Sequence, residues 1–293
     1  MNLQRLRYFV AVADELHFGR AAERLHMAQP PLSQQIRVLE TELGVALLDR
    51  TTRRVELTAA GALLLPEARR LVAQADAVER LMVDHASGEA GSVRLGFVDS
   101  SSYAVMPSFV RAHREAHPAV QFELHTLSSD AQWAALRAGE LDLGIARCAP
   151  AADDLDVVVI RDERLYVAVP TGHPVAGRQS TSLGRLTGES FIGFDRRESP
   201  ALAREMRSLL AEAGVEWDPI LEAEEYTTIL GLVAAGEGIA VVPASVRSFQ
   251  PANLRYIRLR DRQATTRLLL LTRRNDPLGV VQRARAVAAT VFP

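Results

Sequence analysis

The sequence contains no lysine, so all 34 of its basic residues are arginine, and its formal net charge of -2 shows no overall basic excess. Any binding to nucleic acid must therefore rest on a local patch of arginines. The single cysteine, Cys148, excludes an intramolecular disulfide framework. No apolar run approaches the roughly 18 residues that a membrane span needs, and no apolar signal region follows the first residues, MNLQRLRYFV. We therefore expect a cytoplasmic protein without membrane contact.

Sequence motifs of the common enzyme classes are also missing. The chain has no G-x-S-x-G, Walker A or G-x-G-x-x-G segment, so no catalytic nucleophile or cofactor loop is indicated. His113 and His117 flank Glu115 in HREAH, but the order differs from the zinc motif H-E-x-x-H, and the exposed face of an amphipathic helix explains them better. We expect no enzyme activity, no cofactor and no metal.

Three helices are predicted at the start of the chain, whose 293 residues suit two or three domains. Apolar residues at helical spacing indicate the first two, over residues 3–13 and 18–25. The third lies in AQPPLSQQIRVLETELG, where paired prolines suit the first turn of a helix and Gly44 suits its end. Its buried stripe is predicted to be Leu32, Ile36, Leu39 and Leu43.

The opposite face of this third helix is polar at its N-terminal end. Two helices, a tight turn and a third helix with such a face form the arrangement in which a recognition helix enters the major groove of DNA. Glutamine suits adenine and arginine suits guanine there. The alternative is an ordinary helical bundle whose polar face is merely solvated. The candidate DNA-contacting residues of this face are Gln29, Pro30, Pro31, Ser33, Gln34 and Arg37.

Residues 45–58, VALLDRTTRRVELT, alternate and turn like a two-stranded hairpin. Arg50, Arg53 and Arg54 lie around its tip, where they are placed to bind phosphates or to enter a narrow minor groove. Taken alone, an arginine-rich turn is usually just solvated. Beside a recognition helix, it predicts the wing of a winged helix-turn-helix domain.

A long helix is predicted over residues 58–85, with Thr58 as its N-cap. A heptad seam runs along it, which favours the same helix of a second chain as partner, with packing onto the chain's own body as the alternative. The segment SGEAGS, residues 87–92, is typical of a linker. The seam, and hence the candidate dimerisation surface, consists of Leu64, Ala68, Leu71, Ala75, Val78 and Met82, followed by His85.

From residue 93 onward, strand-like and helical segments alternate. VRLGFV, VQFELHTL, LDLGIA, LDVVVI, LYVAVP, FIGF, IAVVP and RLLLLT are strand-like, and SFVRAHREAH, QWAALRAG, SPALAREMRSLLAEAG and TILGLVAAG are helical. This alternation predicts α/β units with largely parallel sheets and with ligand contacts at the carboxyl ends of the strands.

Several of these segments resemble a known family. The run RYFVAVADELHFGRAAERLHMAQPPLSQQIRVLETELGVALLDRTTRRVELTAAG resembles the N-terminal domain of LysR-type transcriptional regulators, densely over residues 1–62. VRLGFVDSSSYAVMPSFVRAHREAHPAVQFEL, LRAGELDLGIAR, LYVAVPTGHP and LGLVAAGEGIAVVP resemble the effector domain of that family. QPPLSQQI, GFVDSSSY and GIAR together are most similar to the branch that controls the breakdown of aromatic compounds and senses muconate-like acids or benzoate.

The resemblance implies a domain organisation and a set of partners. A winged helix-turn-helix domain is expected over residues 1–58 and a linker helix with a hinge over 59–90. An effector-binding domain over 91–293 would consist of two periplasmic-binding-protein-like α/β subdomains, I (91–161 and 267–293) and II (162–266). The expected partners are double-stranded promoter DNA, a small-molecule effector and further copies of the chain in dimers and tetramers, with RNA polymerase as a further candidate.

Candidate effector-binding residues lie where strands end and helices begin. Free N–H groups at a helix start favour an anion, so a carboxylate is the candidate effector, although Asp99 opposes an anion and leaves room for an amino or neutral compound. The alternative for each serine or threonine is a plain N-cap. The resemblance implies effector contacts for Ser100, Ser129 and Arg147. The full candidate set is Asp99, Ser100, Ser101, Ser128, Ser129, Arg147, Phe194, Thr227 and Thr228.

The sequence thus predicts a DNA-binding transcriptional regulator that responds to a small molecule. One alternative is a ligand-binding or enzymatic α/β protein whose N-terminal helices serve only assembly. Another keeps DNA binding but makes Cys148 a redox sensor, because the cation of Arg147 beside it would lower its thiol pKa. The absence of a second, resolving cysteine favours a plain buried thiol instead.

Overall fold

The computed structural model describes residues 2–50, 55–87, 91–150, 154–274, 276 and 278–292. The chain divides into two compact units. One consists of Met1–Val83 with Arg137–Glu140, and the other of Asp84–Leu136 with Leu141–Pro293. None of the described helices is both long and apolar enough to cross a membrane.

The first unit begins with the three predicted helices. They are α1 (Leu3–Glu15), α2 (Phe18–Arg24) and α3 (Gln29–Leu43), and their apolar faces meet in one core. Leu32, Ile36 and Leu39 of α3 are fully buried there, as the spacing predicts. Leu43 is 38% exposed, so its predicted burial is wrong. It lies in the last turn of α3, where Gly44 takes the left-handed conformation (φ 69°) and the chain turns away.

The predicted wing forms as a hairpin. Strands β1 (Leu48–Arg50) and β2 (Val55–Leu57) pair antiparallel. The carboxylate of Glu40 on α3 accepts the backbone N–H groups of Leu47 and Leu48, at 3.0 and 3.2 Å, and so ties the hairpin to the helix. Arg53 and Arg54 lie outside the described residues, as does the side chain of Arg50.

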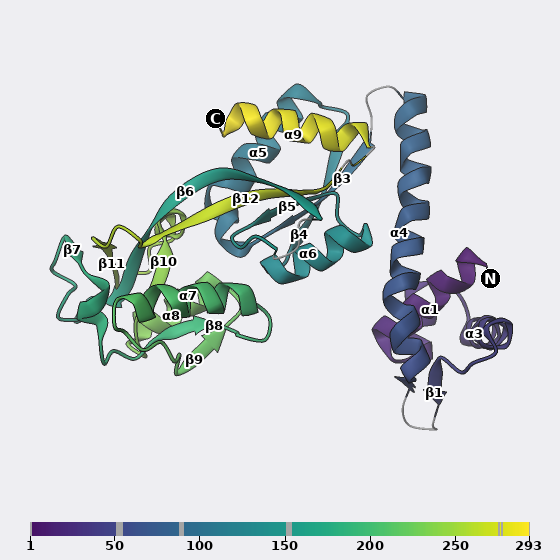
Figure 1. Ribbon diagram of the computed structural model, residues 1–293, viewed down its shortest axis with the longest axis horizontal. Coiled ribbons are helices and arrows are strands. Elements are labelled where there is room, and N and C mark those ends of the chain that lie inside the picture. Colours follow the sequence, from purple (N-terminus) through teal and green to yellow (C-terminus); the bar gives the residue numbers. More distant parts are fainter. Residues whose placement is uncertain are drawn as a thin grey trace. The chain divides into compact units, whose positions relative to one another are not determined.

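Helix α4 (Ala59–Ser87) follows, and Thr58 caps it by accepting the N–H of Gly61 at 3.0 Å. Figure 1 shows α4 as the long helix beside α1. The predicted seam does not lie open along its whole length, because Ala68 is fully buried in the core of its own chain and Leu64 packs against that core. The placement of Ala68 in a surface for a second chain is therefore wrong. The exposed part of the seam begins only at Leu71.

The second unit has two lobes, and an eight-stranded sheet extends through both of them. Lobe I contains the parallel strands β3 (Gly91–Phe97), β4 (Val120–Thr126) and β5 (Leu143–Ala146). The linker predicted at residues 87–92 is therefore too long, because its last two residues begin β3 and its first ends α4, while residues 88–90 are not described. The helices of this lobe are α5 (Val105–Ala116), α6 (Ser129–Ala138) and α9 (Gly279–Val291), and a 3₁₀ turn, η1 (Asp99–Tyr103), precedes α5.

Lobe II holds the remaining elements around its own apolar core. Its strands are β7 (Ser180–Thr181), β8 (Ile192–Phe194), β9 (Leu221–Ala223), β10 (Ala240–Pro243) and β11 (Leu254–Leu259). Its helices are α7 (Pro200–Glu212) and α8 (Tyr226–Ala235), with 3₁₀ turns η2 (Leu183–Leu186) and η3 (Ala244–Ser248).

Two long strands join the lobes (Figure 1). The chain leaves lobe I along β6 (Leu155–Pro170), which merges two strands that the sequence predicted separately, and returns along β12 (Thr265–Arg273). Because the two strands run in opposite directions, they pair antiparallel with each other and with β5, β10 and β11. The expectation of largely parallel sheets is therefore wrong, and the sheet is mixed.

The histidine pair of α5 also differs from its prediction. His113 is fully buried, with its ring against those of Phe109 and Phe122 at centroid distances of 6.1 and 4.9 Å, whereas His117 is half-buried. Neither ring nitrogen of His113 has a hydrogen-bond partner among the described residues. Burial lowers the pKa of His113 to about 4. The helix face that carries this histidine therefore belongs to the core and is not the exposed face.

Candidate functional site

The N-terminal end of α3 presents the predicted polar face. Burial of Leu32 and Ile36 on one side of the helix turns the intervening positions outward. Ser33 is half-buried, whereas Gln29, Pro30, Pro31, Gln34 and Arg37 are exposed. The N-cap residue, Ala28, supplies no side-chain hydrogen bond to the first turn. This end of α3 therefore offers uncommitted donors to a partner.

Arg37 differs from the other arginines of the helical core. Arg5 pairs with Glu42, and Arg20 and Arg24 pair with carboxylates at the end of α1, at 3.2 Å. No ion pair or side-chain hydrogen bond to another described residue holds Arg37. Its guanidinium keeps five donors for a bidentate contact, such as one to guanine.

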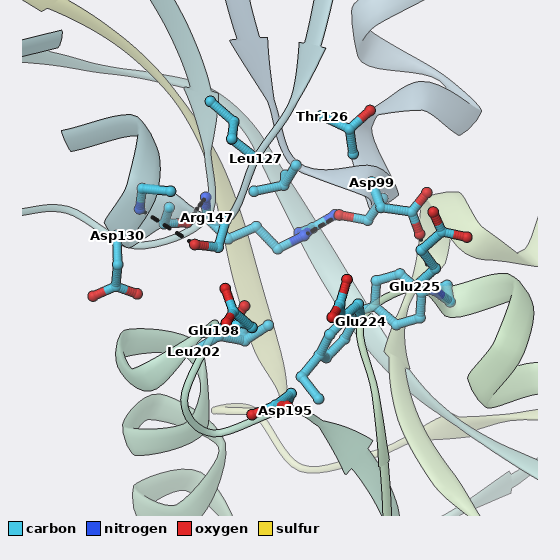
Figure 2. A pocket seen from close by; sticks show the side chains of 18 residues that line it. Asp99, Thr126, Leu127, Asp130, Arg147, Asp195, Glu198, Leu202, Glu224 and Glu225 are labelled. Carbon is cyan, nitrogen blue, oxygen red and sulfur yellow. Dashed lines mark hydrogen bonds between the residues drawn. The ribbon is translucent and has the colours of Figure 1, made fainter. Parts of the chain in front are cut away.

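A cavity of about 250 Å³ lies between the lobes of the second unit. Figure 2 shows its side chains, contributed by residues at the strand ends of lobe I and around α7 and α8 in lobe II. The structure brings six of the predicted effector residues together at this cavity: Asp99, Ser100, Ser128, Ser129, Arg147 and Phe194.

Three predicted effector residues do not line the cavity. Ser101 is fully buried, and its hydroxyl donates to the carbonyl oxygen of Val98 at 2.8 Å within the 3₁₀ turn. Thr227 and Thr228 are exposed on α8, one and two residues past its start. The helix begins at Tyr226, and it is Tyr226 that faces the cavity. The prediction for these three residues is therefore wrong.

Arg147 is the centre of a buried hydrogen-bond network. Its Nε donates to the Ser100 hydroxyl at 2.6 Å, and its backbone N–H donates to the Ser129 hydroxyl at 3.1 Å. Its guanidinium forms an ion pair with Glu163 at 2.7 Å, and the two side chains are only 3% and 2% exposed. The two serines thus position Arg147 and do not act as N-caps, and the positive charge of Arg147 is already matched by Glu163.

Two carboxylates of lobe I reach helix starts of lobe II. Asp99 accepts the N–H of Tyr226 in the first turn of α8 at 2.9 Å, and Asp130 accepts the N–H of Ala201 in the first turn of α7 at 3.1 Å. Burial raises the pKa of Asp99, and the nearby Glu225 raises it further, against the lowering effect of the Tyr226 amide. Both helix starts, which favour anions, are therefore occupied by the protein's own carboxylates.

Sequence reasoning missed most of the lobe II side of the cavity. The unpredicted charged lining residues are Asp130, Asp195, Glu198, Glu224 and Glu225. Four of them follow β8 or β9, so the strand-end rule that found the lobe I residues also applied to them. The segment FIGF was identified as a strand, and the acidic residues just after it were the available signal.

Cys148 does not have the features of a redox-sensing thiol. It is 1% exposed, and burial raises the pKa of its thiol well above the usual range, with the carboxylate of Glu205 raising it further. Because the thiolate is the reactive form, this environment suppresses oxidation chemistry. The structure favours the plain buried thiol.

Comparisons with known proteins match both units of the chain. Residues 3–62 match the bacterial regulatory helix-turn-helix protein family of lysR type, and residues 86–291 match the LysR substrate binding domain. The chain belongs to the LysR family of transcriptional regulators. The HTH-type transcriptional regulator BenM of Acinetobacter baylyi is 37% identical over 93% of this chain and 90% of BenM.

Solved structures of LysR-type regulators are similar to this chain over its full length or over its effector-binding part. Full-length CbnR in complex with its target DNA has a TM-score of 0.79 and 29% identity, covering 99% of this chain and 100% of CbnR. The BenM effector binding domain with its effector benzoate has a TM-score of 0.63 and 30% identity, covering 69% of this chain and 91% of that domain. The chain is thus a DNA-binding transcriptional regulator of this family, with a helix-turn-helix domain followed by an effector-binding domain.

Proposed function

We propose that the N-terminal end of α3 contacts the bases of promoter DNA and that the arginines of the wing bind the DNA backbone. The observation that carries this proposal is the exposed Arg37, which has no carboxylate partner among the described residues while its neighbouring arginines have one. Phosphate contacts position such a domain, and base-edge contacts supply its specificity. The proposed DNA-contacting residues are Gln29, Pro30, Pro31, Ser33, Gln34, Arg37, Arg50, Arg53 and Arg54.

The exposed half of α4 is proposed to pair with the same helix of a second copy. Leu71, Val78 and Met82 are 37%, 55% and 55% exposed, and Ala75 lies between them at heptad spacing. Such a stripe of apolar side chains is stable in water only when it is covered. Pairing along this half would place two α3 helices on two half-sites of DNA, and pairs of dimers would form tetramers.

The cavity is proposed to bind the effector and to couple it to DNA. Asp99 and Asp130, both in lobe I, each accept a hydrogen bond from the start of a lobe II helix. A ligand that changes these contacts would therefore change the angle between the lobes. A change in that angle would alter how dimers pair, and hence how they bend DNA and recruit RNA polymerase. The relative BenM, whose effector domain holds benzoate, supports the placement of a small ligand in this domain.

The proposal includes the domain boundaries and the setting in which the protein acts. The helix-turn-helix domain is proposed over residues 1–58, the linker helix and hinge over 59–90 and the effector domain over 91–293. The lobe boundaries at residues 161 and 266 fall within β6 and β12, the strands that the lobes share. We propose that the protein acts on bacterial promoters in the cytoplasm and carries out no catalysis, in keeping with relatives that are regulators.

The test is a footprinting titration on the DNA upstream of the gene, at fixed salt, with wild-type protein and the double variant Ser33→Ala/Arg37→Ala. The proposal predicts that the variant loses specific protection while its oligomeric state in sedimentation stays unchanged. Arg111→Ala is the control, because Arg111 is an exposed arginine of α5 in the other unit. Protection by the double variant equal to that by wild type would refute the assignment of DNA reading to Ser33 and Arg37.

A further inference from the structure

The cavity between the lobes has an unusual charge for a site that is expected to bind a small acid. Six carboxylates line it: Asp99, Asp130, Asp195, Glu198, Glu224 and Glu225. One guanidinium, that of Arg147, is the basic group among the lining residues. The cavity is therefore strongly negative at neutral pH, and an organic acid entering it would be repelled.

The groups that usually bind an acid are already occupied. Arg147 is neutralised by the buried Glu163 at 2.7 Å, and its Nε donates to the Ser100 hydroxyl. The first turns of α8 and α7 already donate backbone N–H groups to the carboxylates of Asp99 and Asp130. An acidic guest would have to break the buried Arg147–Glu163 pair or one of the two half-buried helix-start contacts, and so leave a charged group without its partner.

Two of the carboxylates, by contrast, have no partner within the part of the chain that the structure describes. Glu198 and Glu224 form no hydrogen bond or ion pair with any residue of the described ranges, and Figure 2 shows their side chains pointing into the cavity from the side of lobe II. Asp195 and Glu225 each accept one local hydrogen bond, from the Arg197 backbone and the Thr227 hydroxyl. The cavity thus keeps its free acceptors for a guest with a positive charge.

The remaining walls are suited to an apolar body. Leu127 and Leu202 line the cavity together with Phe194, whose ring packs edge-on against that of Tyr226 at 4.7 Å. An aromatic face near carboxylates favours an organic cation through both electrostatic and apolar contacts. A metal ion is a poorer fit, because no group of three or more acidic, histidine or cysteine side chains within the described residues is arranged to hold one.

We propose that the effector of this regulator is a small organic cation, an amine or amidine with a short apolar or aromatic body and no carboxylate. The charged end lies between Glu198 and Glu224, and the body packs against Phe194, Leu127 and Leu202. This proposal rests on the proposed function, since it assumes that the effector occupies the cavity. A cationic effector also agrees with the sequence analysis, in which Asp99 left room for an amino compound.

Four probes of similar size and different charge test the proposal on the full chain. Benzylamine and benzamidine are cations, benzyl alcohol is neutral and benzoate is an anion. Calorimetry and the thermal unfolding midpoint are measured with each probe at low and moderate salt. We expect at least one cation to bind and raise the midpoint, at least tenfold more tightly than the alcohol, with affinity falling as salt rises. Binding of benzoate, or of neither cation, would overturn the proposal.

Variants show whether the cation uses the predicted carboxylates. Glu198→Gln/Glu224→Gln keeps the shape of both side chains and removes their charge, so it should weaken cation binding at least tenfold. Glu212→Gln removes an exposed carboxylate at the far end of α7 and should bind as wild type does. Equal affinity of the double variant and wild type would contradict the assignment.

DNA footprints made in parallel separate this proposal from the proposed function. Specific protection of the upstream DNA without any ligand supports the regulator, whichever probes bind. Specific protection combined with benzoate binding, or with no binding of the cations, would refute the cationic effector alone. If the wild-type protein protects no specific DNA site, with or without a ligand, the proposed function itself is refuted.

Discussion

The buried ion pair of Arg147 and Glu163 leads to a quantitative prediction. Both side chains are almost completely excluded from water, and their closest atoms are 2.7 Å apart. Removing one partner leaves the other as an uncompensated buried charge, which typically costs about 3–5 kcal/mol. We therefore expect Arg147→Met and Glu163→Gln each to lower the free energy of unfolding of the effector unit by about 3–5 kcal/mol.

The double variant should behave differently from the sum of the single variants. With both charges gone, neither side chain is left as a buried ion, so Arg147→Met/Glu163→Gln should cost less than either single change. Ser100 and Ser245 would lose hydrogen bonds to the pair, which accounts for a residual cost of about 1–2 kcal/mol.

Urea unfolding followed by tryptophan fluorescence measures these values. The two tryptophans of the chain, Trp133 and Trp217, both lie in the second unit, so their signal reports on the effector-binding part. Single variants that cost under about 1 kcal/mol, the usual value of an exposed pair, would refute the reasoning. A double variant whose loss of unfolding free energy equals the sum of the two single losses would refute it as well. Arg147 would then not be neutralised by Glu163, and its charge would be available to a ligand in the cavity.

Three further predictions follow from other parts of the chain. Because burial lowers the pKa of His113 from 6.5 to about 4, the effector unit should lose up to about 3 kcal/mol of stability as the pH falls from 6.5 to 4. His113→Leu should remove most of that pH dependence in urea titrations, and an unchanged slope would contradict the assignment. Arg37→Ala should weaken specific DNA binding by about 1–3 kcal/mol in gel-shift titrations and relax base preference at one position; a uniform loss on all sequences would indicate a phosphate contact instead. Val78→Glu should shift the protein to smaller oligomers in sedimentation, because it places a charge in the exposed seam of α4, and an unchanged distribution would exclude this seam from the interface.

Local patterns in the sequence predicted the helix-turn-helix part well. The paired prolines, the apolar spacing of Leu32, Ile36 and Leu39, and Gly44 each act within a few residues, and the structure places α3 accordingly. Ala68 was misassigned because a heptad pattern shows only that a helix face is covered. Whether the cover comes from the same chain or from a second copy depends on tertiary packing.

Most of the predicted cavity residues lie on one side, in lobe I, and Phe194 is the one predicted lining residue from lobe II. Lobe I residues follow their strands directly, so the rule for strand ends found Ser100, Ser129 and Arg147. On lobe II, the predicted Thr227 and Thr228 lie one and two positions after Tyr226, the residue that lines the cavity. Each step of one residue along a helix turns the side chain by about 100°. The acidic residues after β8 and β9 carried a local signal, but their position opposite the lobe I residues depends on β6 and β12, which bring two distant segments together.

A footprint on the upstream DNA, with and without a ligand whose binding to the cavity has been shown by calorimetry, tests the central claim most directly. The account predicts protection of two half-sites about one or more whole turns apart, with a pattern that shifts when the cavity is saturated. It also predicts that Glu198→Gln/Glu224→Gln needs at least tenfold more ligand to give the same shift. A footprint that is identical with empty and saturated cavity would contradict the claim that the ligand controls how this regulator holds DNA.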